Sequence, residues 1–546
     1  MGPTPIGSLR RHRGALVFAG LAVSACGKAP PEPRIPVSGT EPLAVSTRYG
    51  TYRAQPARER VFAFLGVPYA RQPVGDRRWR EADPPDPSSQ TFDAHAFGPT
   101  AVQQPDEHEP ASATPQGEDC LSLNVWTRGP RAVPRPVLVW IHGGANVSGG
   151  TADPLYDGHN FVRDNDVVLV SINYRLGPFG FLDLSEVGGP AYARSRNLGL
   201  LDQLAALRWV RANIAAFGGD SGNITVFGES AGGSAIIRLL GMPLARRLFD
   251  KAIIESGGPA NIKVKGYPKK DDIPAGRALT RELLREAGVT DLAGLAALPA
   301  KAVLAAAGAV ARQRGDKMGV STWGARVDDL VLPEDVFGNI HRGTNPNVKV
   351  LIGTNEDEML YFRLYDPAFE LSLMREYHAT ATAMGRAFGT VKAVADRYTA
   401  GSQDPMRYVD FAGEFWLRQP SIVLAEGQAR HNDVYMYLWT WDSRVPGLGA
   451  AHAIELPFVF GNLSGSGAEA LAGPGPPAEL SRRIQAAWTA FALTGNPTAG
   501  GEPPWPRYTQ ETRATMLLTD GPWRVVNDPK GEARRILREM YDVDVR

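Results

Sequence analysis

Apolar strand-like runs that stop at glycines constrain the fold of this chain more than any other sequence feature. "PVLVWIHGG" and "DVVLVSINYRLG" are continuous rather than alternating in their apolar residues, as expected for strands buried on both faces. Between such runs, "LGLLDQLAALRWVRANIAAFGG" has apolar residues at helical spacing and ends at a double glycine. Strands that alternate with helices indicate a mostly parallel sheet flanked by helices. We therefore predict an α/β fold.

Two long segments interrupt this alternation, at about residues 261–325 and 360–430. Both are predicted to be helical insertions over the functional site. The chain of 546 residues could hold several ordinary domains, but the strands and helices on either side of the insertions continue one pattern. We predict a single catalytic domain over residues 46–546.

The N-terminus has the pattern of an export signal. A basic patch, "LRRHRG", precedes "ALVFAGLAVSAC", an apolar run too short to span a bilayer. Its end resembles the lipobox of bacterial lipoproteins, so residues 1–25 are predicted to be removed and Cys26 to carry a lipid. Lys28 is not the aspartate that retains such proteins at the inner membrane. The alternative is ordinary cleavage after Ala25.

The segment that follows the signal is rich in proline. Residues 26–45, which include "KAPPEPRIP", are predicted to form an extended tether. We expect an exported protein, lipid-anchored in the cell envelope at the outer membrane or cell surface, or otherwise periplasmic or secreted. The lipid on Cys26 is the only membrane attachment that we expect.

The stretch "ITVFGESAGGSAIIRLL" combines a buried strand, a G-x-S-x-G turn and a helix. In that setting the turn is a nucleophile elbow, in which a strained backbone presents the hydroxyl of Ser230 beyond the sheet. Gly228 and Gly232 are expected where strand and helix approach too closely for a side chain. The five-residue pattern occurs by chance in long chains, but the strand before it and the helix after it favour a catalytic serine.

A second glycine-rich loop, in "WIHGGANVSGG", follows an earlier strand. Such a loop supplies backbone N–H donors to an oxyanion, together with the residue after the nucleophile. Gly144, Ala145 and Ala231 are the predicted donors. The alternative, a phosphate-binding loop, is not favoured because no Lys-Ser/Thr pair follows the glycines.

The chain has 9 histidines, and His452 is the predicted general base. It lies late in the chain, which fits the order nucleophile, acid, base. His142 lies inside the oxyanion loop and is expected to support it. For the acid, "VKVLIGTNEDEML" offers Glu356, Asp357 and Glu358 at the end of a strand, and the residue pattern leaves all three open.

Several motifs in the same order resemble the type B carboxylesterases, the cholinesterase-like branch of the α/β-hydrolase fold. They include "FLGVPYARQPVGDRRW", "EDCLSLNVW", "INYRLGPFGFL", "VFGESAGG", "GAAHAIELPFVFG" and "AAWTAFALTGNP". The resemblance extends from about Val61 to about Met516. It implies a serine esterase that hydrolyses carboxylic esters through an acyl-enzyme intermediate on Ser230.

The resemblance also assigns the acid. The glutamate of the family's "DEG" motif falls on Glu358, although Met359 replaces the usual glycine. The implied catalytic triad is Ser230, Glu358 and His452. Beside it, Ser256 matches a serine that supports the acid, and Glu229 matches an acidic residue next to the nucleophile. The family's two structural ion pairs fall on Arg78 with Glu118 and on Arg175 with Asp202.

The sequence departs from the family pattern near the site. Ala101 occupies the position of a cysteine that would pair with Cys120, so Cys120 is expected to be a free thiol. Residues 101–119 contain no tryptophan, which argues against a choline-ester specialist because that tryptophan binds the quaternary ammonium. Asn146 stands where an aromatic residue is frequent.

The charge balance limits the partners. Lys and Arg total 59 against 58 Asp and Glu, so there is no electrostatic reason to expect nucleic acid. We expect a small-molecule ester substrate and no metal or organic cofactor, and the oligomeric state is left open. Two other functions are considered: an amide or carbamate hydrolase with the same triad, and a binding protein that has lost the chemistry. A missing triad residue would indicate the latter, and all three are present.

Overall fold

The computed structural model describes residues 42–104, 114–258, 272–316, 319, 321–384 and 389–541. All of them belong to one compact unit, Ser38–Arg546. The predicted signal segment, Cys26 and most of the predicted tether lie outside the described residues. No helix in the described ranges is long and apolar enough to cross a membrane.

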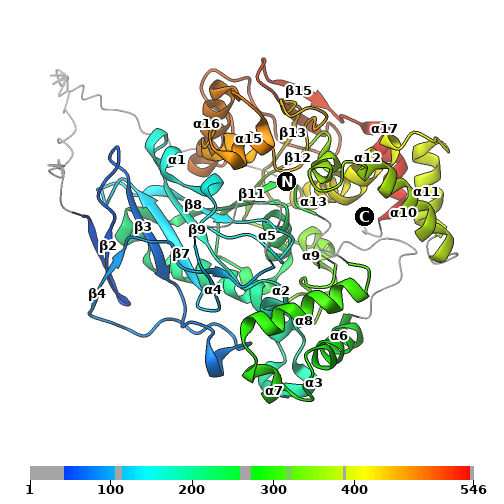
Figure 1. The fold of residues 1–546 in the computed structure, drawn as a ribbon. Helices are drawn as coiled ribbons and strands as arrows, with labels where there is room; N and C mark the ends of the chain where they lie inside the picture. The colour runs from blue at the N-terminus through cyan, green and yellow to red at the C-terminus, as the bar shows by residue number, and fades with distance from the viewer. Residues whose placement is uncertain are drawn as a thin grey trace, which may run out of the picture. The chain divides into compact units, whose positions relative to one another are not determined.

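A 10-stranded sheet forms the centre of this unit (Figure 1). Six parallel pairings join the seven strands from β14 to β9 in the order below. At the two edges, β15, β7 and β3 pair antiparallel. This confirms the predicted α/β-hydrolase fold with a mostly parallel sheet. The strand order is β15 (Arg524–Asn527), β14 (Ala514–Leu518), β13 (Val434–Trp439), β12 (Lys349–Asn355), β11 (Lys251–Glu255), β10 (Gly219–Glu229), β8 (Arg135–Ile141), β9 (Val168–Ile172), β7 (Ser122–Thr127) and β3 (Phe62–Pro68).

Both faces of the sheet are buried by helices. Val139 of β8 belongs to one hydrophobic core, and its neighbours Leu138 and Trp140 belong to the other. The continuous apolar runs follow from this, because alternate residues of each strand face different cores. The first core is covered by α4 (Leu198–Asn213), α5 (Ala231–Gly241) and α13 (Gln419–Gln428), and the second by α1 (His159–Asp164), α14 (Leu456–Phe460) and α16 (Ala478–Thr494).

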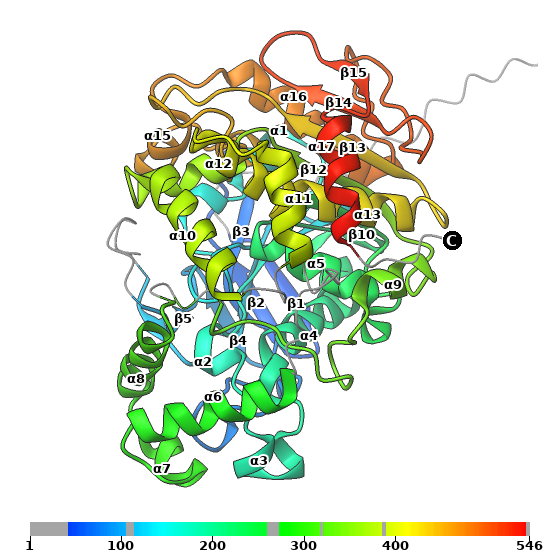
Figure 2. The ribbon, with the colours of Figure 1, turned by 90° about the vertical axis from the view of Figure 1, so that its right-hand side faces the viewer.

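The two predicted insertions are helical. The first contains α6 (Asp272–Glu286), α7 (Leu292–Ala297) and α8 (Ala300–Gln313), and α9 (Val336–His341) follows it. The second contains η7 (Glu358–Leu364), α10 (Phe369–Met384), α11 (Gly389–Thr399), α12 (Met406–Gly413) and the π-helical turn η9 (Glu414–Arg418). In Figure 2, α11 lies beside α17 (Gly531–Leu537), and both contribute to a third, smaller core.

The folded part begins slightly before the predicted boundary at residue 46. β1 (Ala44–Thr47) pairs with β2 (Gly50–Ala54), and Ala44 lies opposite Arg53. The last residues of the predicted tether, Ala44 and Val45, are therefore part of a paired strand. The other short elements are β4 (Thr91–Ala94), β5 (Thr100–Ala101), β6 (Gln116–Gly117), α2 (Gly177–Gly180), α3 (Ser185–Gly188) and α15 (Ser466–Ala472).

The predicted site residues all follow the carboxyl ends of strands. The glycine loop follows β8, Ser230 follows β10, Ser256 follows β11, Glu358 follows β12 and His452 lies beyond β13. Since these strands are parallel neighbours, their carboxyl ends meet at one edge of the sheet. Ligand sites of open α/β sheets lie at this edge.

Candidate active site

Ser230 sits in a strained turn between β10 and α5. Its φ is +56° and its ψ is −116°, a conformation that residues other than glycine rarely adopt. A Cβ added at Gly232 would overlap the carbonyl oxygen of Ile141, and one at Gly228 would lie 2.6 Å from the same oxygen. The two glycines are therefore needed because β8, β10 and α5 approach one another closely around the serine.

The glycine loop lies directly against this turn. A Cβ added at Gly143 would lie 3.0 Å from Glu229 Oε2 and 3.3 Å from Ser230 Cβ. Gly144 has φ +93° and Ala145 has φ +53°, so the loop runs through left-handed backbone. In the described part of the chain, the N–H groups of Gly144, Ala145 and Ala231 have no hydrogen-bond acceptor. They are free to bind an oxyanion.

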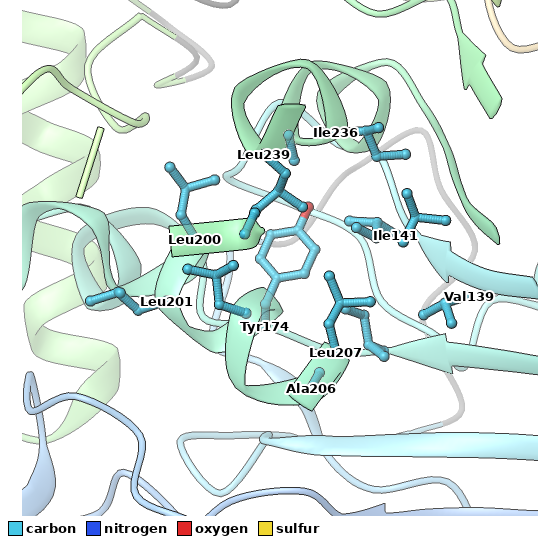
Figure 3. Packing of buried hydrophobic residues seen from close by; sticks show 14 of the residues in the cluster. Val139, Ile141, Tyr174, Leu200, Leu201, Ala206, Leu207, Ile236 and Leu239 are labelled. Atoms are coloured by element: carbon cyan, nitrogen blue, oxygen red, sulfur yellow. The ribbon is translucent and has the colours of Figure 1, made fainter. Parts of the chain in front are cut away.

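His142 supports the loop from below, as its place in the sequence suggested. Its ring stacks on Tyr174 with 4.4 Å between the ring centroids, and its Nδ1 lies 2.9 Å from the Gly143 carbonyl oxygen. Burial lowers the pKa of His142 to about 4, so the ring is neutral. Tyr174 donates a hydrogen bond of 2.8 Å to the His142 carbonyl and is packed among Ile141, Leu200, Leu207, Ile236 and Leu239 (Figure 3).

His452 and Glu358 are in direct contact. His452 Nδ1 lies 2.6 Å from Glu358 Oε2, and both side chains are buried. The other oxygen of Glu358 accepts hydrogen bonds from the Ser256 hydroxyl at 2.7 Å and from the Asn355 backbone N–H at 2.8 Å. Two donors thus hold the Glu358 carboxylate in one orientation, and the carboxylate in turn orients the imidazole.

Of the three acids that the strand end offers, only Glu358 points at the imidazole. Asp357 accepts a hydrogen bond of 3.0 Å from the backbone N–H of Ala450 and so positions the loop that carries His452. Glu356 is exposed. The structure therefore separates three residues that the local pattern left equivalent.

Glu229 forms a second contact with the imidazole. Its Oε1 lies 2.9 Å from His452 Nε2, on the side of the ring opposite to Glu358. Burial lowers the pKa of His452, but the carboxylates of Glu229 and Glu358 outweigh burial and raise that pKa well above its ordinary value. The imidazole is thus held between two acids.

Ser230 is close to this arrangement but not bonded to it. In the described residues, its hydroxyl forms no hydrogen bond, and His452 Nε2 faces Glu229. A catalytic hydrogen bond between serine and histidine is often loose without substrate and tightens when substrate binds.

Two residues of the site were not predicted. Asn355 supports Glu358 through its backbone, and its side chain donates hydrogen bonds of 2.6 Å to the Ala451 carbonyl and to Glu455 Oε2. Tyr361 packs its ring against the His452 ring, with centroids 5.8 Å apart and an interplanar angle of 69°. Neither has a local sequence signal, since both contacts depend on where the chain beyond β12 folds.

The two predicted ion pairs lie away from the triad residues and connect separate segments. Arg175 Nη2 lies 2.6 Å from Asp202 Oδ1 in full burial, and Arg78 pairs with Glu118 through both oxygens. Cys120 is a buried free thiol, as predicted, and burial raises its pKa to about 12. Within the ranges that the structure describes, no cluster of His, Cys, Asp or Glu is arranged as a metal site.

The chain is similar to known proteins over nearly all of its described length. The model of the carboxylesterase family matches residues 42–536, nearly the whole described chain. The chain belongs to the carboxylesterase family. This carboxylesterase is 38% identical over 500 residues to the para-nitrobenzyl esterase of Bacillus subtilis, covering 90% of this chain and 98% of that protein. It is 33% identical over 484 residues to the phenmedipham hydrolase of Pseudarthrobacter oxydans, covering 86% and 93%.

Solved structures agree with the sequence comparison. A thermophilic para-nitrobenzyl esterase superposes on this carboxylesterase with a TM-score of 0.79 at 35% identity, covering 90% of this chain and 99% of the other. A carboxylesterase of Geobacillus stearothermophilus gives a TM-score of 0.77 at 36% identity, with the same coverage. The protein is a serine carboxylesterase that hydrolyses carboxylic esters, as the sequence predicted.

Proposed function

We propose that Ser230 is the nucleophile of this esterase, His452 its general base and Glu358 the acid that orients the imidazole. The observation that carries this assignment is the contact of 2.6 Å between His452 Nδ1 and Glu358 Oε2, beside a serine held at φ +56°. Glu358 keeps a proton of the ring on Nδ1, so Nε2 can accept the serine proton once it has lost its own. Glu358 also stabilises the imidazolium that results.

The reaction then proceeds in two halves. Ser230 Oγ attacks the ester carbonyl carbon while its proton moves to His452 Nε2, and the oxyanion binds to the N–H groups of Gly144, Ala145 and Ala231. The imidazolium gives its proton to the leaving alcohol, which leaves an acyl-enzyme. Water attacks the acyl carbon with the same histidine as base, and the carboxylic acid departs.

A substitution at Ser230 tests the assignment. With p-nitrophenyl butyrate, we expect a burst of p-nitrophenol from the wild type when acyl-enzyme accumulates, and a loss of kcat of about 10⁵-fold or more in Ser230→Ala. Ser464→Ala, at an exposed serine, is the matched control and is expected to resemble the wild type. Full activity in Ser230→Ala with the fold intact would contradict the assignment.

The leaving group is a separate question, because the triad does not choose between an ester, an amide and a carbamate. The two relatives above carry the names of different substrates, so family membership alone leaves the substrate open. Matched p-nitrophenyl butyrate and butyryl p-nitroanilide differ only in the bond that breaks. We expect kcat/KM to be greater for the ester; a greater value for the anilide would favour the amidase alternative.

We also propose that the protein is exported and anchored by a lipid on Cys26. The support is the basic patch, the short apolar run and the "VSAC" sequence. Metabolic labelling with a fatty acid is expected to mark the wild type and not Cys26→Ser. Export without labelling of the wild type would favour ordinary cleavage after Ala25.

A further inference from the structure

A row of polar side chains crosses the sheet directly behind the triad residues. In the parallel pairing of β10 to β13, Glu229 lies opposite Glu255, Glu255 opposite Gly353, and Gly353 opposite Tyr437. Residues paired in this way point to the same face of the sheet. The row therefore connects Glu229, which contacts His452, with two further titratable groups that the proposed reaction does not use.

Gly353 leaves room for the Tyr437 ring in this row. A Cβ at this position would overlap the ring of Tyr437, so the ring lies over the glycine, which is next to Glu255 in the row. From the helix layer, Trp488 of α16 donates a hydrogen bond of 2.7 Å to Glu255 Oε1. Glu455, the residue before α14, accepts a hydrogen bond from Asn355 on one side and interacts electrostatically with Glu255. Glu255 and Tyr437 are completely buried, and Glu455 is 1% exposed.

The buried groups around Glu255 offer more hydrogen-bond acceptors than donors. In the described residues, Glu255 Oε2, Glu455 Oε1, Asn355 Oδ1 and the Tyr437 hydroxyl are buried without a hydrogen-bond partner. Three of these four atoms are acceptors when the carboxylates are ionised. A protonated carboxyl group supplies the donor that is missing, and it also removes a charge that burial makes costly.

The charges of the neighbouring side chains also favour a protonated carboxyl group. Four buried carboxyl groups interact electrostatically with one another or with the imidazole: Glu229 on β10, Glu255 on β11, Glu358 on η7 and Glu455 before α14. His452 is the one cation among these described groups. Burial, followed by the neighbouring carboxylates, raises the pKa of Glu455 well above its ordinary value. Burial is also the main cause that raises the pKa of Glu255 to about 8.

We propose that Glu255 is protonated in the folded protein at neutral pH: its Oε1 accepts the hydrogen bond from Trp488, and its Oε2, which has no partner among the described residues, carries the proton. Glu255 is then a positioning residue: its neutral carboxyl group fills the row next to Glu229 without adding a charge. The negative charge that acts on His452 is thereby confined to the two carboxylates in contact with its ring. This consequence for His452 rests on the proposed function, whereas the proton on Glu255 does not.

Infrared spectroscopy of the purified protein tests the proton directly. We expect the wild type to show the carbonyl stretch of a buried protonated carboxyl group at pH 7, shifted in D2O and lost by about pH 10. Glu255→Gln should lack one such band. Glu502→Gln is the matched control, because that carboxylate pairs with Arg483, and it should keep the band. The absence of the band from the wild type, or an undiminished band in Glu255→Gln, would overturn the proposal.

Thermal stability gives a second readout. A carboxyl group whose pKa is raised in the folded state stabilises the fold below its unfolded pKa, and this contribution is lost as pH rises through the folded pKa of about 8. The Tm of Glu255→Gln relative to wild type should therefore increase by several degrees between pH 6 and pH 9. A difference that stays constant with pH would contradict a bound proton, even if the substitution lowers Tm at every pH.

The pH–rate profile connects the proton to catalysis. Since Glu255→Gln replaces one neutral group by another, the midpoint of the acid limb of kcat/KM should not move. A midpoint shifted to lower pH would show that Glu255 is ionised in the wild type. A wild type with no esterase activity would instead contradict the proposed function and leave the infrared result standing.

Discussion

His452 lies between two carboxylates, and this arrangement sets the pH at which its imidazole can act as a base. Glu358 and Glu229 stabilise the protonated ring, which raises the pKa of His452 well above its ordinary value. The proton on Nε2 must be absent before Ser230 can be deprotonated. The carboxylate of Glu229 therefore opposes the first step of the proposed reaction at low pH, and it stabilises the imidazolium once that step has occurred.

Removing the charge of Glu229 should move the acid limb of the pH–rate profile. In Glu229→Gln the pKa of His452 falls, so the base is neutral at lower pH and the midpoint of kcat/KM shifts to lower pH by about one unit or more. The measurement is kcat/KM for p-nitrophenyl butyrate across pH. Glu356→Gln, at an exposed glutamate of the same strand end, is the control. An unchanged midpoint in Glu229→Gln would show that Nε2 faces a different group in solution.

At the scale of secondary-structure elements, the turn between β10 and α5 is defined by what surrounds it. The carbonyl of Ile141 at the end of β8 leaves no room for side chains at Gly228 and Gly232. The backbone of Ser230 is also held by its N–H bond of 3.0 Å to the Glu255 carbonyl and by the bond of 2.8 Å from Ser234 N–H to its own carbonyl. The strained conformation of Ser230 is thus imposed by two neighbouring strands and one helix.

A methyl group at Gly232 should disrupt this junction. Because the added carbon would overlap backbone, which cannot rotate away, Gly232→Ala is expected to cost about 3 kcal/mol or more and to remove most esterase activity. The measurements are Tm and kcat/KM. Gly500→Ala is the control, since a Cβ there meets nothing within 4 Å. Equal Tm values and activities for the two variants would contradict the close approach of α5 to β8.

At the scale of the whole molecule, Arg175 and Asp202 join segments that are distant in sequence. Asp202 lies on α4, and the guanidinium of Arg175 also donates a hydrogen bond of 2.8 Å to the carbonyl of Arg80. Both side chains are buried, with 3% and 0% of their surfaces exposed. The pair is therefore costly to break, because either partner alone is a buried and unpaired charge.

Asp202→Asn should destabilise the protein by about 3–5 kcal/mol, since it leaves the Arg175 charge buried without its counter-ion. Asp93→Asn breaks the exposed pair of Arg53 and Asp93 and should change Tm very little. Thermal unfolding of the two variants beside the wild type measures the difference. Comparable Tm losses in both would mean that burial does not decide the strength of these pairs.

Local patterns predicted the elements of this fold well. The glycine-ended apolar runs are β8 and β9, because burial on both faces of a sheet demands continuous apolar residues. The two segments predicted as helical insertions contain α6 to α8 and α10 to α12. The start of the folded chain was predicted less well. Ala44 belongs to β1 rather than to the tether, because a strand partner, not composition, orders it.

The sequence by itself determined the fold class, the family and the position of the turn that carries Ser230, because each is indicated by motifs of residues that are neighbours along the chain. Only the tertiary structure decided which of three acids meets His452, that Glu229 reaches the other ring nitrogen, and that Glu229, Glu255 and Tyr437 form one row. The physical reason is register. Which side chains meet across parallel strands depends on crossovers through helices and long insertions, and a shift of one residue would turn every side chain to the opposite face.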